Sequence, residues 1–273
     1  MLHHLQASAA KFGLKIHFGK TKVMTWKSLA HSRPSVSVGG ESVTILDERA
    51  SEKYLGRKLA FQSCQEVEIA NRLAAGWAAF TKHKSELCCK HYCLRDRVRL
   101  FDATVSPAVL YGCTTWALTE RLQNKLQVTR RRMLRYVLRV FRCKVDGDDE
   151  EWVSYMQRAT RKIERLTLEL GMKDWVEIHR RRKWQFAGKL ARQTDSRWSH
   201  LLLDWKLNLG HGRSRGHPCT RWADPLESFA GGAWIDIAAD SDHWDFLEEG
   251  FVTHDGQFFV PGVTPEASSN ESM

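Results

Sequence analysis

Asp148 and Asp149 form the only Asp-Asp pair in the chain. Closely spaced carboxylates are what polymerases and many nucleases use to hold a pair of divalent metal ions. The pair lies in the acidic run 145–151, which contains a glycine and has no flanking apolar strand residues. Such a run is typical of a solvated loop. We therefore expect no metal site here and no catalytic residue in the chain.

Asp204 and Lys206 fit one half of a nuclease signature, the carboxylate-x-Lys sequence. The partner aspartate of that signature should follow a proline upstream, and no Pro-Asp sequence occurs in the chain. A nuclease that uses Asp204 and Lys206 is therefore the least favoured of the functions considered.

Three cysteines, Cys88, Cys89 and Cys93, lie close to His83 and His91, which suggests a zinc site. Structural zinc sites usually combine two close ligand pairs, and a second pair is missing, so buried thiols are the favoured interpretation. The seven cysteines form no regular framework and no signal peptide precedes them. We expect an intracellular protein, nuclear or cytoplasmic and not secreted, without a membrane span.

Charge is divided unevenly along the chain. All 42 Lys and Arg residues lie in residues 1–223, together with 21 of the 32 acidic residues, so this part carries a net charge of +21. Residues 224–273 hold the other eleven acids and no Lys or Arg. A strongly positive body attracts polyanions, and we expect nucleic acid as the partner, although a solvated charged surface is the alternative.

The clearest predicted helix covers residues 121–142, where apolar side chains repeat on one stripe. Four arginines fall on the opposite stripe and are expected to face outward toward phosphates: Arg131, Arg135, Arg139 and Arg142. The alternative is an ordinary solvated helix face. A second basic run is also expected to bind nucleic acid: Arg180, Arg181, Arg182 and Lys183.

The hydrophobic pattern predicts a mainly α fold with a small N-terminal α+β segment. Residues 1–62 combine the end of a helix at 2–12, an alternating strand at 14–18, a hairpin turning at Gly39-Gly40 and a short strand at 54–59. Residues 63–145 and 146–260 read as two helical segments, with Pro107 interrupting one helix, and 261–273 as a disordered tail.

Several segments, taken in order, resemble the reverse transcriptases of non-LTR (LINE-type) retrotransposons. Residues 13–24 (Gly-Leu-Lys-Ile-His-Phe-Gly-Lys-Thr-Lys-Val-Met) resemble the palm motif D, with His17 where the family has Asn. Residues 52–56 (Glu-Lys-Tyr-Leu-Gly) resemble motif E, the primer grip. Residues 94–116 and 131–135 resemble the thumb, and residues 212–240 resemble the region after it. The fold implied is the end of a polymerase palm, a helical thumb and a helical extension.

The resemblance also implies roles for particular residues. Lys20, with Lys22 beside it, would lie near the phosphates of the incoming nucleotide, and Tyr54, Leu55 and Gly56 would position the 3′ end of the primer. Arg131, Arg135 and Arg139 would face the template–primer backbone. The metal-binding aromatic-Ala-Asp-Asp motif of the family precedes motif D and is absent here. Mg²⁺ is therefore expected only for an intact polymerase, and no polymerase activity is expected for this chain alone.

The sequence thus favours a fragment of a retrotransposon RNA-directed DNA polymerase that binds an RNA–DNA hybrid or duplex. Two alternatives remain open at this stage: a stand-alone basic module that binds nucleic acid, and a non-functional relic of a retroelement.

Overall fold

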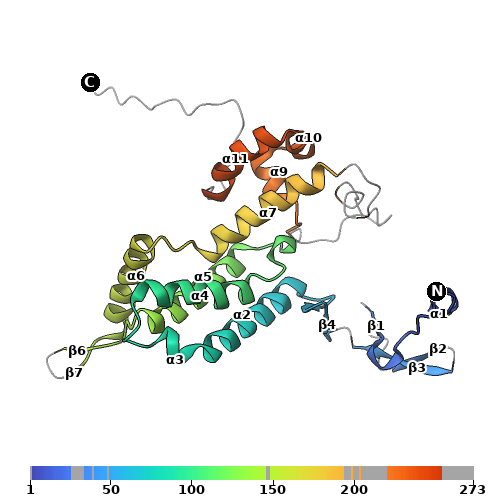
Figure 1. Cartoon of the computed structure of the whole chain (residues 1–273), viewed down its shortest axis with the longest axis horizontal. Coiled ribbons are helices and arrows are strands. Elements are labelled where there is room, and N and C mark those ends of the chain that lie inside the picture. The colour runs from blue at the N-terminus through green and yellow to red at the C-terminus, as the bar shows by residue number, and fades with distance from the viewer. Residues whose placement is uncertain are drawn as a thin grey trace. The chain divides into compact units, whose positions relative to one another are not determined.

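The chain is mainly helical, with small sheets near its N-terminus, as the sequence predicts (Figure 1). The computed structural model describes residues 2–25, 34–38, 40–47, 49–145, 148–193, 198, 203 and 220–253. Two compact units make up the chain, Met1–Ala75 and Gly76–Met273, and the division falls inside helix α2 (Cys64–Lys82). The segment boundaries expected from the sequence stay predictions.

The first unit begins with helix α1 (Leu2–Ala10), which ends two residues before the predicted end at residue 12. Gly13 has a φ of 71°, and the amides of Gly13 and Leu14 bond back to carbonyls in the last turn of the helix. The strand predicted for residues 14–18 is wrong. The chain instead forms the 3-10 turn η1 (Phe18–Lys20), because the backbone and side chain of Thr21 both bond to the carbonyl of His17, at 3.1 and 3.0 Å.

A three-stranded sheet follows, with the order β1-β3-β2. Its strands are β1 (Lys22–Met24), β2 (Ser35–Val38) and β3 (Glu41–Leu46); β1 is parallel to β3 and β2 is antiparallel to it. Val38 pairs with Glu41, which confirms the predicted two-residue turn, and Gly40 takes the positive φ of 86° that such a turn requires.

The single strand predicted for residues 54–59 is in fact a second hairpin. Strands β4 (Glu52–Tyr54) and β5 (Arg57–Leu59) pair antiparallel through a turn at Leu55 and Gly56. Both turn residues have positive φ, 48° and 82°, as in the tight turn that matches the twist of paired strands. Leu55 is an unusual residue for that position, because its Cβ disfavours the left-handed region.

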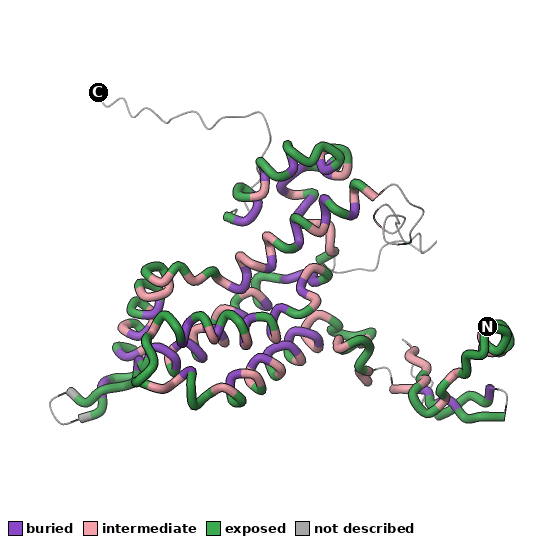
Figure 2. Tube along the Cα trace, viewed as in Figure 1, coloured by how far each residue is buried: buried purple, intermediate pink, exposed green. Residues whose placement is uncertain are grey.

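The second unit holds most of the helices. They are α3 (Lys84–Leu87), α4 (Leu94–Val109), η2 (Cys113–Thr115), α5 (Glu120–Val137), α6 (Trp152–Glu169), α7 (Trp175–Ala191), α9 (Asp224–Ala230), α10 (Trp234–Ala239) and α11 (Ser241–Thr253). Figure 2 shows buried residues along the inner faces of α4, α5 and α7. Helix α4 continues through Pro107 to Val109, so Pro107 does not interrupt the helix as expected.

Helix α5 ends five residues earlier than predicted. The helix stops at Val137, and Arg139 takes a left-handed φ of 53°. The amide of Val140 then bonds to the carbonyl of Arg135 at 2.8 Å, which closes the helix end. This turn brings Val140 into the core, where it is 1% exposed and its carbonyl accepts a bond from Tyr155. Core packing of Val140 thus overrides the helical period.

The acidic run expected to be a loop contains a short hairpin, β6 (Lys144–Val145) with β7 (Asp148–Asp149). Glu150, directly after β7, accepts two hydrogen bonds from Arg158 of α6, at 2.8 and 2.7 Å. These bonds lower the pKa of Glu150 to about 2. The guanidinium of Arg158 also donates to the carbonyl of Phe141, so one side chain ties both ends of the segment to α6.

Tryptophans organise the core of the second unit. Trp175 stacks on Phe101 with a ring-centroid distance of 6.0 Å and donates to Ser106. Trp184 of α7 and Trp244 of α11 stack at 3.6 Å, and each indole donates to the carbonyl of the other. Around this pair the helices α7, α9, α10 and α11 share one apolar cluster. No helix among the described residues is long and apolar enough to cross a membrane.

Candidate nucleic-acid interface

A groove between α2 and α5 combines basic and aromatic side chains. It has a volume of about 370 Å³. Its lining residues are Trp77, Phe80, Thr81, Lys84, Arg132 and Tyr136. Trp77 and Thr81 are four residues apart on α2, as are Arg132 and Tyr136 on α5, so helical periodicity directs each pair to one face.

The groove is positively charged and has aromatic walls. The guanidinium carbon of Arg132 lies 5.5 Å from the ring centroid of Trp77, and no carboxylate lines the groove. Phe80 connects the two walls, since its ring contacts both Trp77, at 5.5 Å, and Tyr136, at 6.2 Å. Cations beside exposed aromatic faces are the combination that binds a phosphate backbone while bases stack.

The arginine stripe expected to face outward on α5 is partly covered, because α6 packs beside it. Arg131 lies 4.0 Å from the carboxylate of Glu164, and Arg135 contacts the sulfur of Met156 at 3.3 Å. Both arginines are half-buried. Arg132 directly follows Arg131, so its side chain is turned by about 100° around the helix axis from that of Arg131. Arg132 therefore faces the groove. Trp77 and Phe80 face it from α2, and because only the packing of α2 beside α5 brings these residues together, no pattern in the sequence identifies Arg132.

Arg139 and Arg142 lie beyond the end of α5 and do not continue its row. Arg139 is exposed and donates to the carbonyl of Cys88 at 3.1 Å. Arg142 donates to the carbonyl of Glu150 and lies 3.9 Å from the carboxylate of Asp149. These four arginines therefore form no continuous surface, and their contact with nucleic acid stays a prediction.

The second basic run lies on α7, and two of its arginines bind neighbouring helices. Arg181 forms ion pairs with Glu248 and Glu249 of α11, at 2.8 and 2.7 Å. Arg180 donates to the carbonyl of Val252 and to the side chain of Gln123, both at 3.2 Å. The acid-rich helix α11 thus packs on the basic helix α7.

Lys183 is the most buried member of the run, with 1% of its surface exposed. Its ammonium donates to the carbonyl of Trp116 at 3.2 Å and lies 5.2 Å from the ring centroid of Trp222. Burial lowers the pKa of Lys183 to about 8, although nearby Asp224 acts in the opposite direction. Arg182 is the exposed member of the run. Because the side chain of Lys183 is buried and that of Arg182 is exposed, the two residues cannot belong to one binding surface.

The residues predicted to contact nucleotide and primer lie in the first unit. Lys20 is exposed in η1. The ammonium of Lys22 in β1 lies 3.0 Å from the carboxylate of Glu52 in β4. This ion pair links β1 to the hairpin that carries Tyr54, which is 62% exposed, and Leu55, which is 74% exposed.

Glu68 of α2 holds that hairpin in place. Glu68 is 1% exposed; it accepts a 2.7 Å bond from the amide of Lys58 and lies 3.3 Å from Arg72. Arg72 in turn donates to the carbonyl of Gly56. A buried carboxylate and its arginine therefore hold β5 and the turn residue Gly56 against α2, while Tyr54 and Leu55 stay exposed.

That the chain holds no metal site stays a prediction. Within the described ranges, no three His, Cys, Asp or Glu side chains gather.

Cys88 and Cys89 are half-buried, but Cys93 is exposed at the start of α4 and donates to Asp96, so the prediction of buried thiols is wrong for Cys93. Asp204 and Lys206 lie outside the described residues.

Comparison with known proteins gives one relevant match. Over 258 residues the chain is 28% identical to a protein of Caenorhabditis elegans described as an uncharacterized transposon-derived protein. The match covers 89% of this chain and 86% of that protein. The chain is therefore related along most of its length to a protein of transposon origin. No family model matches it, and no solved structure does.

Proposed function

We propose that the chain is the C-terminal part of a retrotransposon reverse transcriptase and binds template–primer nucleic acid. Two observations support the origin. The motifs that resemble the palm and thumb of non-LTR reverse transcriptases occur in order along the chain, and a relative over most of its length is transposon-derived.

The observation that supports binding most strongly is the groove between α2 and α5. Arg132 and Lys84 supply the charge that holds a phosphate backbone. Trp77 and Tyr136 supply ring faces on which a base at the end of a duplex stacks. Because neither group reads base edges, the groove would bind without regard to sequence.

In this proposal the hairpin tip serves the primer. Tyr54 and Leu55 are exposed at the turn, and Leu55 keeps a left-handed conformation that costs about 1–2 kcal/mol in a residue other than glycine. Backbone strain of this kind is concentrated at functional sites. The strained turn thus agrees with a role at the 3′ end of the primer.

Fluorescence anisotropy with a labelled RNA–DNA hybrid that has a recessed 3′ end tests the proposal. We expect Arg132→Gln to weaken binding about fivefold through the loss of one charged contact, and Trp77→Ala to weaken it by about 1–3 kcal/mol through the loss of stacking. Arg165→Gln is the matched control, because Arg165 is an exposed arginine of α6 outside the groove.

Three outcomes separate the functions. Weaker binding of a blunt hybrid than of the recessed one supports the thumb-like role. Equal binding of both, still dependent on Arg132, supports a stand-alone basic module. If Arg165→Gln weakens binding as much as Arg132→Gln, the groove is not the binding surface and the proposal fails.

A further inference from the structure

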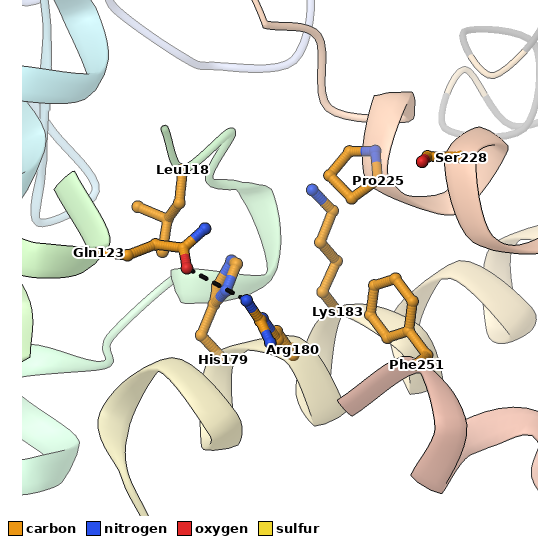
Figure 3. A pocket seen from close by; sticks show the side chains of 8 residues that line it. All are labelled: Leu118, Gln123, His179, Arg180, Lys183, Pro225, Ser228 and Phe251. Carbon is orange, nitrogen blue, oxygen red and sulfur yellow. Dashed lines mark hydrogen bonds between the residues drawn. The ribbon is translucent and has the colours of Figure 1, made fainter. Parts of the chain in front are cut away.

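A second cavity lies among α5, α7, α9 and α11 (Figure 3). Its volume is about 210 Å³. The lining residues are Leu118, Gln123, His179, Arg180, Lys183, Pro225, Ser228 and Phe251. None of them lines the groove between α2 and α5, so the two sites are independent.

Two cations and no carboxylate line this cavity. Arg180 is fixed by its bonds to Gln123 and Val252. Lys183 is 1% exposed and forms no ion pair with any described residue; its hydrogen bond goes to the carbonyl of Trp116. A buried charge without a counterion costs several kcal/mol, so an anion in the cavity would be strongly favoured.

The carboxylate that acts on Lys183 is already engaged elsewhere. Asp224 raises the pKa of Lys183, yet its own carboxylate lies 3.1 Å from Arg221 and also accepts the amide of that residue. Asp224 does not line the cavity. Among the described residues that line the cavity, none supplies a carboxylate for Lys183.

His179 adds an uncharged donor. It is 4% exposed and stacks on Trp116 at 5.7 Å. Neither ring nitrogen has a hydrogen-bond partner among the described residues. Burial, reinforced by Lys183 and Arg180, lowers the pKa of His179 to about 3, so the ring is neutral and carries one N–H to donate.

We infer that this cavity binds a small organic oxyanion, with its phosphate or carboxylate group held by Lys183, Arg180 and His179. In Figure 3 Lys183 extends from α7 toward Pro225 of α9, while His179 and Arg180 lie beside Gln123 on the other side of the cavity. The hydroxyl of Ser228 offers a further polar contact, and Leu118 and Phe251 form an apolar wall for the body of the ligand. A volume of about 210 Å³ suits a head group with one small ring.

Phenyl phosphate and benzoate are suitable probes because each joins an oxyanion to one ring. Binding to the full chain is followed by tryptophan fluorescence at constant ionic strength, since Trp116 and Trp222 lie beside the cavity. We expect saturable binding to the wild type and at least tenfold weaker binding to Lys183→Met. Lys189→Met is the matched control, because Lys189 is an exposed lysine on the same helix.

A second measurement does not depend on the variant folding. Labelling of the wild-type chain with an amine-reactive reagent, read by mass spectrometry, reports the reactivity of Lys183 directly. We expect either probe to slow labelling of Lys183 and to leave Lys189 unchanged. Absence of saturable binding, equal binding by both variants, or equal labelling with and without probe would each overturn the inference. Protection by one probe alone identifies which head group the cavity accepts.

Discussion

Buried polar side chains carry much of the specific geometry of this molecule. Glu68 anchors a hairpin, and Arg130 is buried in α5, where it donates to the carbonyl of Lys173 at 2.9 Å. Lys183 and His179 differ from these, because their polar atoms face a cavity and are only partly satisfied. From the sequence alone, Lys183 was predicted to be a surface cation that binds nucleic acid. A run of four basic residues does not show which side chain points inward.

His179 leads to a prediction about pH. Its pKa in the folded chain is about 3, below the ordinary value of 6.5, so as pH falls the unfolded chain takes up a proton that the folded chain does not. The stability that depends on neutral His179 is complete above pH 6.5 and is lost as pH falls toward 3. We expect the free energy of unfolding to fall by about 1 kcal/mol per pH unit below that point from this residue.

Urea unfolding of the wild type and His179→Phe at several pH values below 6.5 measures this slope. The variant should show a shallower dependence, whatever its absolute stability, because it has no proton to gain at this position. Parallel curves for the two proteins would show that His179 is protonated in the folded chain.

At the scale of elements, local turn chemistry and helical period predicted much of the first unit and the existence of the helices. The paired glycines correctly predicted the β2–β3 hairpin. The end of α5 could not be predicted, because it depends on a tertiary contact that draws Val140 into the core. For the same reason the groove was missed: Trp77 reads as a core residue on α2 until α5 is placed beside it.

Because α11 contacts the basic helix α7, we expect the carboxylates of α11 to compete with nucleic acid for Arg181. Arg181 is held by Glu248 and Glu249, so removing both carboxylates should leave its guanidinium with only the 3.8 Å contact to Glu177 and tighten nucleic-acid binding several-fold at low salt. The variant is Glu248→Gln with Glu249→Gln. The matched control changes charge equally on the same helix, at the exposed positions Asp242 and Asp245, both to Asn.

Anisotropy measurements on the two double variants distinguish a local effect from a general one. Tighter binding by the Glu248/Glu249 variant alone indicates that α11 masks a binding surface on α7. If both double variants bind equally tightly, net charge explains the change and Arg181 has no special part in it.

At the scale of the whole molecule, the charge division along the sequence becomes a folded arrangement within the second unit. The acid-rich residues of α11 pack on the basic helix α7, while Arg132 and Lys84 line a groove without any carboxylate. A net charge of +10 therefore understates the positive potential available to a polyanion at that groove.

The salt dependence of nucleic-acid binding tests whether the positive charge that contacts phosphates lies at the groove. Binding of the RNA–DNA hybrid should weaken as salt rises, because each neutralised phosphate releases counterions. In a plot of log affinity against log salt concentration, Arg132→Gln should reduce the slope by about one, whereas Arg165→Gln should leave it unchanged. Identical slopes for all three proteins would place the phosphate contacts outside the groove.

The mutual indole bonds of Trp184 and Trp244 also bear on how the protein is made. The two residues are 60 positions apart, so during translation at about 5–20 residues per second the first waits roughly 3 to 12 seconds for the second. Throughout that interval the apolar side of α7 lacks the helix that covers it. A nascent chain at this stage presents a hydrophobic segment to chaperones, and a ribosome paused before Trp244 would prolong that exposure.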